Sequence, residues 1–180
     1  NAGTNPATHF IGTTDNQPLL FRINDLWAGR LDSAARNVSL GLRAGQNNGT
    51  AVANIAIGDA ALKTNSTGHR NVAIGDSAGY AINNSWEVVF IGNQAGKGAT
   101  TTGDYSVIIG SHAADSNCVA WTTIVGNYAG RKNAVQGNTM IGSAAGTKNT
   151  TGKVTFVGDN AGLNNITGTG NTFIGASAGK

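Results

Sequence analysis

The chain has 180 residues, of which 27 are glycine and only 12% are charged. Its net charge of +3 is spread out, with no basic run longer than Arg131-Lys132, which argues against a nucleic-acid-binding face. The single Cys118 excludes an intrachain disulfide, and no apolar stretch is long enough for membrane insertion. Because the chain starts at Asn1 without a visible signal peptide, we expect a processed protein or a part of a longer one.

Residues 1–36 form the first predicted unit, an N-terminal cap or connector. Apolar residues alternate with other side chains over Leu19–Ile23, which predicts a strand. Asn24-Asp25 favours a tight turn, because both residue types tolerate unusual backbone angles. We therefore expect a β-hairpin here that caps the open edge of the unit that follows.

Residues 37–180 form the second unit, which repeats an aliphatic residue, Gly, two variable residues, Ala and usually a second Gly. The repeat glycines recur every 16–18 residues, at Gly41, Gly58, Gly75, Gly92, Gly110, Gly126, Gly142, Gly158 and Gly175. An alanine stands three positions after each, from Ala44 to Ala178, and the second Gly is missing only at Leu62 and Ala114. So regular a period predicts an all-β chain, a parallel β-solenoid (β-roll) of about nine coils, and argues against disorder.

The three residues before each repeat glycine predict a short strand. Its first and third residues share one face, which we expect to point into the coil. The predicted solenoid core on this face comprises Ile57, Val72, Ile74, Val89, Ile91, Val107, Ile109, Val125, Ile141, Val157 and Ile174.

The middle residue of each strand lies on the opposite face and becomes large and apolar from Phe90 onward. A strand that is apolar on both faces must be covered on both, and a coil of about 17 residues leaves nothing else to cover the second face. We therefore expect a homotrimer, intertwined or side by side. Its predicted axis is lined by Phe90, Ile108, Ile124, Met140, Phe156 and Phe173. The alternative, a monomer with an apolar stripe, would tend to aggregate.

An asparagine recurs four positions before the repeat glycine and predicts a ladder of stacked side chains. These residues are Asn37, Asn54, Asn71, Asn138 and Asn171. With about 4.8 Å for each coil, the nine coils predict a short rigid rod about 43 Å long.

Two segments carry a family resemblance. Asn54-Ile55-Ala56-Ile57-Gly58 and Asn71-Val72-Ala73-Ile74-Gly75 resemble the head repeats of trimeric autotransporter adhesins, although the repeat here is longer by two or three residues. The Ala-Gly segments with Asn-Thr-Thr-Gly turns are similar to repeats of bacteriophage tail fibres, and residues 9–21 resemble the segment that precedes them there. The resemblance spans residues 37–180 and implies a left-handed β-roll trimer on a virion or a bacterial cell surface. Those fibres often carry a C-terminal assembly chaperone, which these 180 residues do not contain.

No catalytic, metal-binding or cofactor-binding pattern competes with the repeat, so we expect no enzyme. The residues considered were three scattered histidines, three carboxylates that follow repeat glycines, and an unpartnered serine: His9, His69, His112, Asp59, Asp76, Asp159 and Ser77. The carboxylates lack the nonapeptide pattern of calcium β-rolls, and the serine has no partnered His and Asp near it to form a catalytic triad. A left-handed β-helix acyltransferase is disfavoured because its period is six residues.

Ice binding is a further alternative, because a Thr ladder on a flat solenoid can match an ice lattice. Thr123, Thr139, Thr155 and Thr172 align in successive repeats, but they replace valines at a position expected to face the core. Thermal hysteresis would separate an ice-binding protein from a fibre.

The expected function is that of an extracellular structural and adhesive fibre segment, from a phage tail fibre or a bacterial surface adhesin. It would present a rigid trimer for host attachment, with itself and a cell-surface glycan or protein receptor as partners. The candidate receptor contacts are aromatic residues outside the predicted core: Trp86, Trp121, Tyr80 and Tyr128. Two alternatives stay open: these rings pack between chains or turns, or the segment is a spacer without binding of its own.

Overall fold

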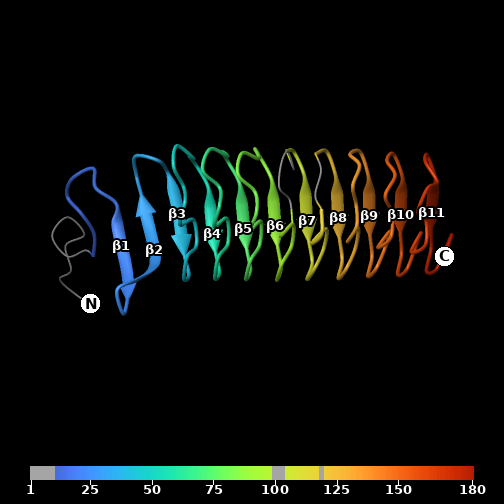
Figure 1. Cartoon of the computed structure of the whole chain (residues 1–180), viewed down its shortest axis with the longest axis horizontal. Helices are drawn as coiled ribbons and strands as arrows, with labels where there is room; N and C mark the ends of the chain where they lie inside the picture. The colour runs from blue at the N-terminus through green and yellow to red at the C-terminus, as the bar shows by residue number, and fades with distance from the viewer. Residues whose placement is uncertain (1–10, 99–103, 118–119) are drawn as a thin grey trace, which may run out of the picture.

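The computed structural model describes residues 11–98, 104–117 and 120–180, and in these ranges the chain is all-β with no helix. His9 and Cys118, named above, lie outside the described residues. The strands form one sheet in chain order along the long axis of the molecule (Figure 1). They are β1 (Leu19–Ile23), β2 (Leu26–Asp32), β3 (Asn37–Leu40), β4 (Ile55–Ile57), β5 (Val72–Ile74), β6 (Val89–Ile91), β7 (Val107–Ile109), β8 (Thr123–Val125), β9 (Thr139–Ile141), β10 (Thr155–Val157) and β11 (Thr172–Ile174).

The predicted N-terminal hairpin is confirmed. β1 and β2 pair antiparallel up to Ile23 and Leu26, and the turn residues Asn24 and Asp25 have φ angles of 49° and 60°. Two positive φ angles are the signature of a type I′ turn, whose twist matches that of the strands beside it. β2 then pairs antiparallel with β3, which places the hairpin against the first strand of the repeat domain.

The predicted parallel solenoid is confirmed as well. From β3 to β11 all neighbouring strands are parallel and in register, so that the chain makes about eight turns, here called rungs. Main-chain hydrogen bonds also join the rungs outside the strands, for example from Ser77 N to Asp59 O (2.8 Å) and from Gly79 N to Ala95 O (2.9 Å). Residues at equivalent positions of successive rungs are called a column below.

The assignment of the two strand faces was wrong. The middle residues, predicted to line a trimer axis, lie inside the solenoid: Phe90, Ile108, Ile124, Met140 and Phe156 are fully buried, and Phe173 packs on the same cluster. The residues predicted as solenoid core lie on the outside of the sheet, half-buried or exposed: Ile57, Val72, Ile74, Val89, Ile91, Val107, Ile109, Val125, Ile141, Val157 and Ile174.

The inversion follows from the narrow interior of a rung. The buried alanine column (Ala44 to Ala161) and the next column, mostly glycine, lie against the middle residue of the strand. A Cβ atom added to Gly96 would lie 2.4 Å from the ring of Phe90, and one on Gly162 would lie 2.6 Å from Phe156. From β6 onward one large side chain of the strand therefore fills the rung, and the interior has no room for the two flanking side chains.

The missing second glycine at Leu62 has the same cause. In the rung of β4 the middle residue is the small Ala56, and Leu62 is fully buried in the space that a larger residue would take. Leu62 keeps the backbone conformation of the glycine column, with a φ of 47° against 57° at Gly79. The rung of β5 has only Ala73 and Gly79 at these two positions, and there Leu62 and Phe90 of the neighbouring rungs both lie beside Gly79.

The predicted asparagine ladder is present with a different bonding pattern. Asn71 N donates to Asn54 Oδ1 (2.9 Å), and Asn54 Nδ2 donates to Gly68 O (2.9 Å). Val88 N in turn donates to Asn71 Oδ1 (3.2 Å). Each buried side-chain amide therefore pairs with main-chain groups of two rungs. These main-chain groups are buried inside a narrow coil, where water cannot take the place of the amide.

Candidate interaction surfaces

The outer face of the sheet carries two columns of mostly apolar side chains. Its first column runs through Leu19, Leu31, Val38, Ile55, Val72, Val89, Val107, Thr123, Thr139, Thr155 and Thr172. Its second column runs through Phe21, Gly29, Leu40, Ile57, Ile74, Ile91, Ile109, Val125, Ile141, Val157 and Ile174. The hairpin continues both columns, so one face of the sheet extends over all eleven strands and is mostly apolar.

Its dimensions follow from strand geometry. Ten spacings of about 4.8 Å and a width of three residues give a face of roughly 48 by 10 Å, or about 480 Å² in projection. Single side chains on it are well exposed, for example Ile74 at 37%. Monomeric proteins rarely expose more apolar surface than this in one patch, and such patches mark interaction sites.

The aligned threonines lie on this outer face, which corrects the expectation that they face the core. Thr123 and Thr172 are exposed, and Thr139 and Thr155 are half-buried. From β8 onward the face therefore pairs a hydroxyl column with an aliphatic column, whereas from β3 to β7 both columns are aliphatic.

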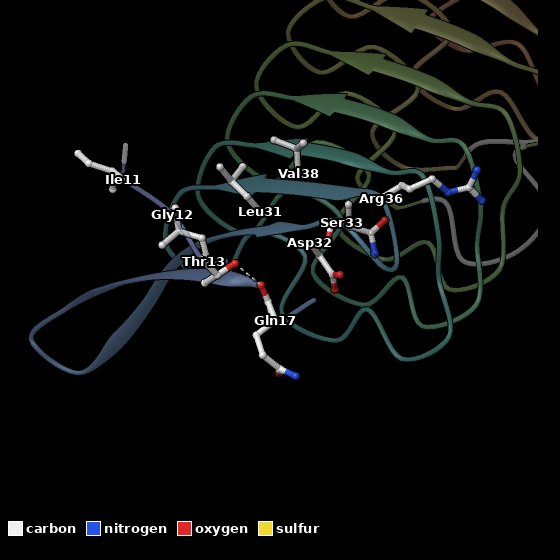
Figure 2. A pocket seen from close by; sticks show the side chains of 11 residues that line it. Ile11, Gly12, Thr13, Gln17, Leu31, Asp32, Ser33, Arg36 and Val38 are labelled. Atoms are coloured by element: carbon white, nitrogen blue, oxygen red, sulfur yellow. Dashed lines mark hydrogen bonds between the residues drawn. The ribbon is translucent and has the colours of Figure 1, made fainter. Parts of the chain in front are cut away.

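An open groove of about 460 Å³ lies where the N-terminal segment meets the hairpin and β3 (Figure 2). Leu31 and Val38 of the outer face line it together with Ile11, Asp32 and Arg36. Asp32 accepts hydrogen bonds from Arg30 and from Ala35 N. This carboxylate is therefore already used by the turn after β2, and the groove adds apolar surface to the outer face together with the exposed Arg36.

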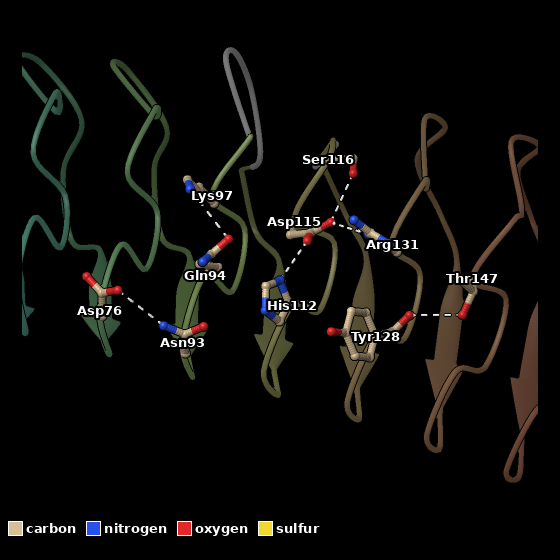
Figure 3. Close-up of polar contacts among 10 residues, drawn as sticks. All are labelled: Asp76, Asn93, Gln94, Lys97, His112, Asp115, Ser116, Tyr128, Arg131 and Thr147. Atoms are coloured by element: carbon tan, nitrogen blue, oxygen red, sulfur yellow. Dashed lines mark hydrogen bonds and ion pairs between the residues drawn. The ribbon is translucent and has the colours of Figure 1, made fainter.

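A polar cluster lies on the turns that follow β7 and β8 (Figure 3). The rings of His112 and Tyr128 are stacked, with centroids 4.9 Å apart and an interplanar angle of 5°. His112 Nδ1 lies 2.9 Å from Asp115 Oδ2, Arg131 Nε donates to Asp115 Oδ1 (3.1 Å), and the guanidinium of Arg131 lies 5.6 Å from the Tyr128 centroid. Asp115 thus holds groups from two neighbouring rungs in one arrangement.

The charge state of Asp115 fits this role. Burial by itself raises the pKa of Asp115, but hydrogen bonds from His112, Ser116 and Arg131 and the positive charge of Arg131 outweigh it, so that the pKa lies below its ordinary value. At neutral pH the group is a carboxylate, which can only accept, so His112 and Arg131 are both donors to it.

The four aromatic candidates do not form one site. Tyr128 belongs to the polar cluster, while Tyr80, three rungs earlier, has Lys63 Nζ 5.2 Å from its ring centroid. Trp86 is exposed and packs on His69, with ring centroids 5.2 Å apart. Trp121 is exposed on the turn before β8.

The sequence reading missed Tyr105, which is 53% exposed. Tyr105 and Trp121 each stand five positions before a repeat glycine and both have positive φ, so they occupy one column on adjacent rungs. The spacing of Tyr105 from its repeat glycine, which equals that of Trp121, is the sequence feature that could have identified it.

The other polar candidates are used locally. Arg43 pairs with Asp59 (2.8 Å), Asn93 Nδ2 donates to Asp76 Oδ2 (3.2 Å), and Ser77 Oγ donates to Asp76 Oδ1 (3.2 Å). In the part of the chain that the structure describes, no three His, Cys, Asp or Glu side chains are placed to share a metal ion. The same residues include no helix that meets the length and apolarity of a membrane span.

Comparisons with protein-family models, with curated proteins and with solved structures found no match.

Proposed function

We propose that this chain is a structural and adhesive segment of an extracellular fibre, of a phage tail or a bacterial surface, in which three copies pack their outer sheet faces around a common axis. The observation that carries the proposal is the outer face of the sheet, where one column is aliphatic from β3 to β11 and the other is aliphatic from β3 to β7. Water on such a face is unfavourable along the whole rod, and a second and third copy offer the same surface in the same register.

The magnitudes agree with assembly. Burial of about 480 Å² per chain at about 25 cal/mol per Å² contributes on the order of 12 kcal/mol for each chain. Association costs about 4–15 kcal/mol, so the face is large enough to offset this cost only when most of its length is buried. The proposal therefore needs parallel chains aligned over the whole sheet.

The narrow strands favour three chains. A strand of three residues is about 10 Å wide, which is also the usual distance between packed sheets. Three such sheets close as the sides of a prism whose centre is filled by their own side chains, whereas wider sheets would leave a central void. The likeness of the repeats to trimeric adhesin heads supports the same number.

Sedimentation equilibrium tests the assembly. We expect three times the chain mass of 18.2 kDa. The double variant Ile74→Glu, Ile91→Glu should sediment as a monomer because it places charges on the outer face. Asn84→Glu adds a charge to an exposed turn and should stay trimeric. A folded wild-type monomer would refute the proposal.

Ice binding remains a second candidate, because the Thr column from β8 to β11 faces outward beside an aliphatic column. The two functions need the same surface, since a face buried in a trimer cannot contact ice. The fibre proposal expects no thermal hysteresis from the wild-type protein. Hysteresis that Thr139→Lys abolishes would favour ice binding instead.

A further inference from the structure

We propose that the polar cluster of His112, Asp115, Tyr128 and Arg131 is a binding site for a carboxylate-bearing sugar of an acidic polysaccharide. The inference deepens the proposed function, on which it rests, by naming a ligand class for host attachment. The site is contained in a single chain, so it can be tested whether or not the trimer forms.

The cluster is ordered before any ligand arrives. Tyr128 is 41% exposed, and the parallel ring of His112 supports it from the preceding rung. Asp115 fixes both His112 and Arg131, and its own side chain is only 9% exposed. A rigid aromatic ring between fixed donors loses little side-chain entropy on binding.

The neighbours of Tyr128 along its column differ in size, and the Tyr128 side chain is exposed. His112, Tyr128 and Ala144 have φ angles of 54–56° at equivalent positions of successive rungs, so Ala144 follows Tyr128 in this column. His112 covers the ring from one side, and Arg131 reaches back towards Asp115 on that same preceding rung (Figure 3). The next residue of the column, Ala144, carries only a methyl group, and the proposal places the pyranose beside it against the Tyr128 ring, because aromatic rings are suited to stacking on sugars.

The charge around the ring selects an anion. Residues 88–154 contain five Lys and Arg but two Asp, so they carry the whole net charge of the chain. The bond to Asp115 uses Nε of Arg131, which leaves both Nη groups of this half-exposed side chain for a ligand. Lys132 is exposed on the same rung, and Lys148 of the next rung is exposed with its Nζ donating to Asn164 Oδ1 (2.9 Å). A guanidinium beside a stacking ring recognises a planar carboxylate on a sugar.

Calorimetry with a hexasaccharide of galacturonic acid tests the site, with maltohexaose as the neutral sugar and hexaglutamate as a polyanion without sugar rings. We expect the wild-type protein to bind only the galacturonate. Tyr128→Ala and Arg131→Gln should each weaken binding at least tenfold. Tyr80→Ala, a matched aromatic change away from the cluster, should leave it unchanged.

The outcomes separate this inference from the fibre proposal. If the protein sediments as a trimer but does not bind the galacturonate hexasaccharide, the sugar site is refuted and the fibre proposal still holds. Undiminished binding by both folded Tyr128→Ala and Arg131→Gln would overturn the site, as would equal binding of hexaglutamate. A monomer that binds galacturonate through Tyr128 and Arg131 would support the site and refute the trimer.

Discussion

Single residues decide how closely the rungs can stack. The repeat glycines combine a positive φ with a contact to the next rung: at Gly75, φ is 134° and an added Cβ would lie 2.5 Å from Gly92 O. By contrast His112 and Tyr128 hold φ angles of 56° and 55° with full side chains, because those side chains point away from the neighbouring backbone. Glycine is therefore required at the first corner by space as well as by conformation.

Gly75→Ala and Gly175→Ala separate these two requirements. Both positions have strained φ, at 134° and 123°, but nothing lies within 4 Å of a Cβ at Gly175. We expect Gly175→Ala to cost about 1–3 kcal/mol from backbone strain, and Gly75→Ala to cost clearly more because it also pushes two rungs apart. Denaturant unfolding of the two variants measures the difference, and equal losses would contradict the stacking argument.

Asp115 predicts an acid-sensitive contribution to stability. Because its pKa is lower in the folded chain than the 3.8 of an ordinary aspartate, its stabilising effect is fully present above that value and is lost as the pH falls through the folded pKa. We expect the melting temperature to fall on acidification below about pH 4, and Asp115→Asn to remove part of that dependence. Asp25→Asn, at the exposed tip of the hairpin, should leave the pH profile unchanged.

At the scale of the rung, the strand and the turn opposite both supply side chains to the narrow interior. Phe90 faces Gly96, whereas Ala56 shares its rung with Leu62, and both arrangements fill the coil. The rung is therefore the unit of packing, and its residues cannot be exchanged independently.

This rule predicts a rescue. Phe90→Ala should lower the free energy of unfolding by about 3–5 kcal/mol, because it leaves a cavity in the rung. Adding Gly96→Leu should recover part of the loss, since Leu62 already occupies the equivalent position with a φ of 47°. Denaturant unfolding measures both variants. A double variant less stable than Phe90→Ala would show that the rungs do not compensate volume in this way.

At the scale of the molecule, two surfaces of different chemistry lie on one rod. The outer face of the sheet is mostly aliphatic, while the polar cluster on the turns presents the half-exposed Arg131 beside the exposed Lys132. Assembly and ligand binding should therefore respond differently to salt.

A change in ionic strength distinguishes trimer assembly from galacturonate binding. In about 1 M NaCl, where the Debye length is about 3 Å, the trimer should persist, because apolar contacts are not screened. Galacturonate binding should weaken at least tenfold relative to about 0.05 M NaCl. Sedimentation and calorimetry at both concentrations measure this. Dissociation of the trimer in salt would contradict an apolar interface.

The sequence by itself determined the repeating architecture. Glycines at a period of 16–18 residues, each followed three positions later by alanine, are compatible only with stacked equivalent turns, and Asn24-Asp25 specified the hairpin turn. The polar cluster is also partly readable, since His112 and Tyr128, like Asp115 and Arg131, stand 16 residues apart and so meet on adjacent rungs.

Only the tertiary structure decided which strand face is inside. Alternation with a period of two residues divides the side chains of a strand into two sets but does not say which set is buried, and here both sets are apolar. The space between the strand and the alanine and glycine columns opposite determines which face is buried. This space accommodates the middle residue of the strand, such as Phe90 or Phe156, but not the first and third residues as well. That space is a property of the closed coil, because it exists only once the turns have brought both walls together.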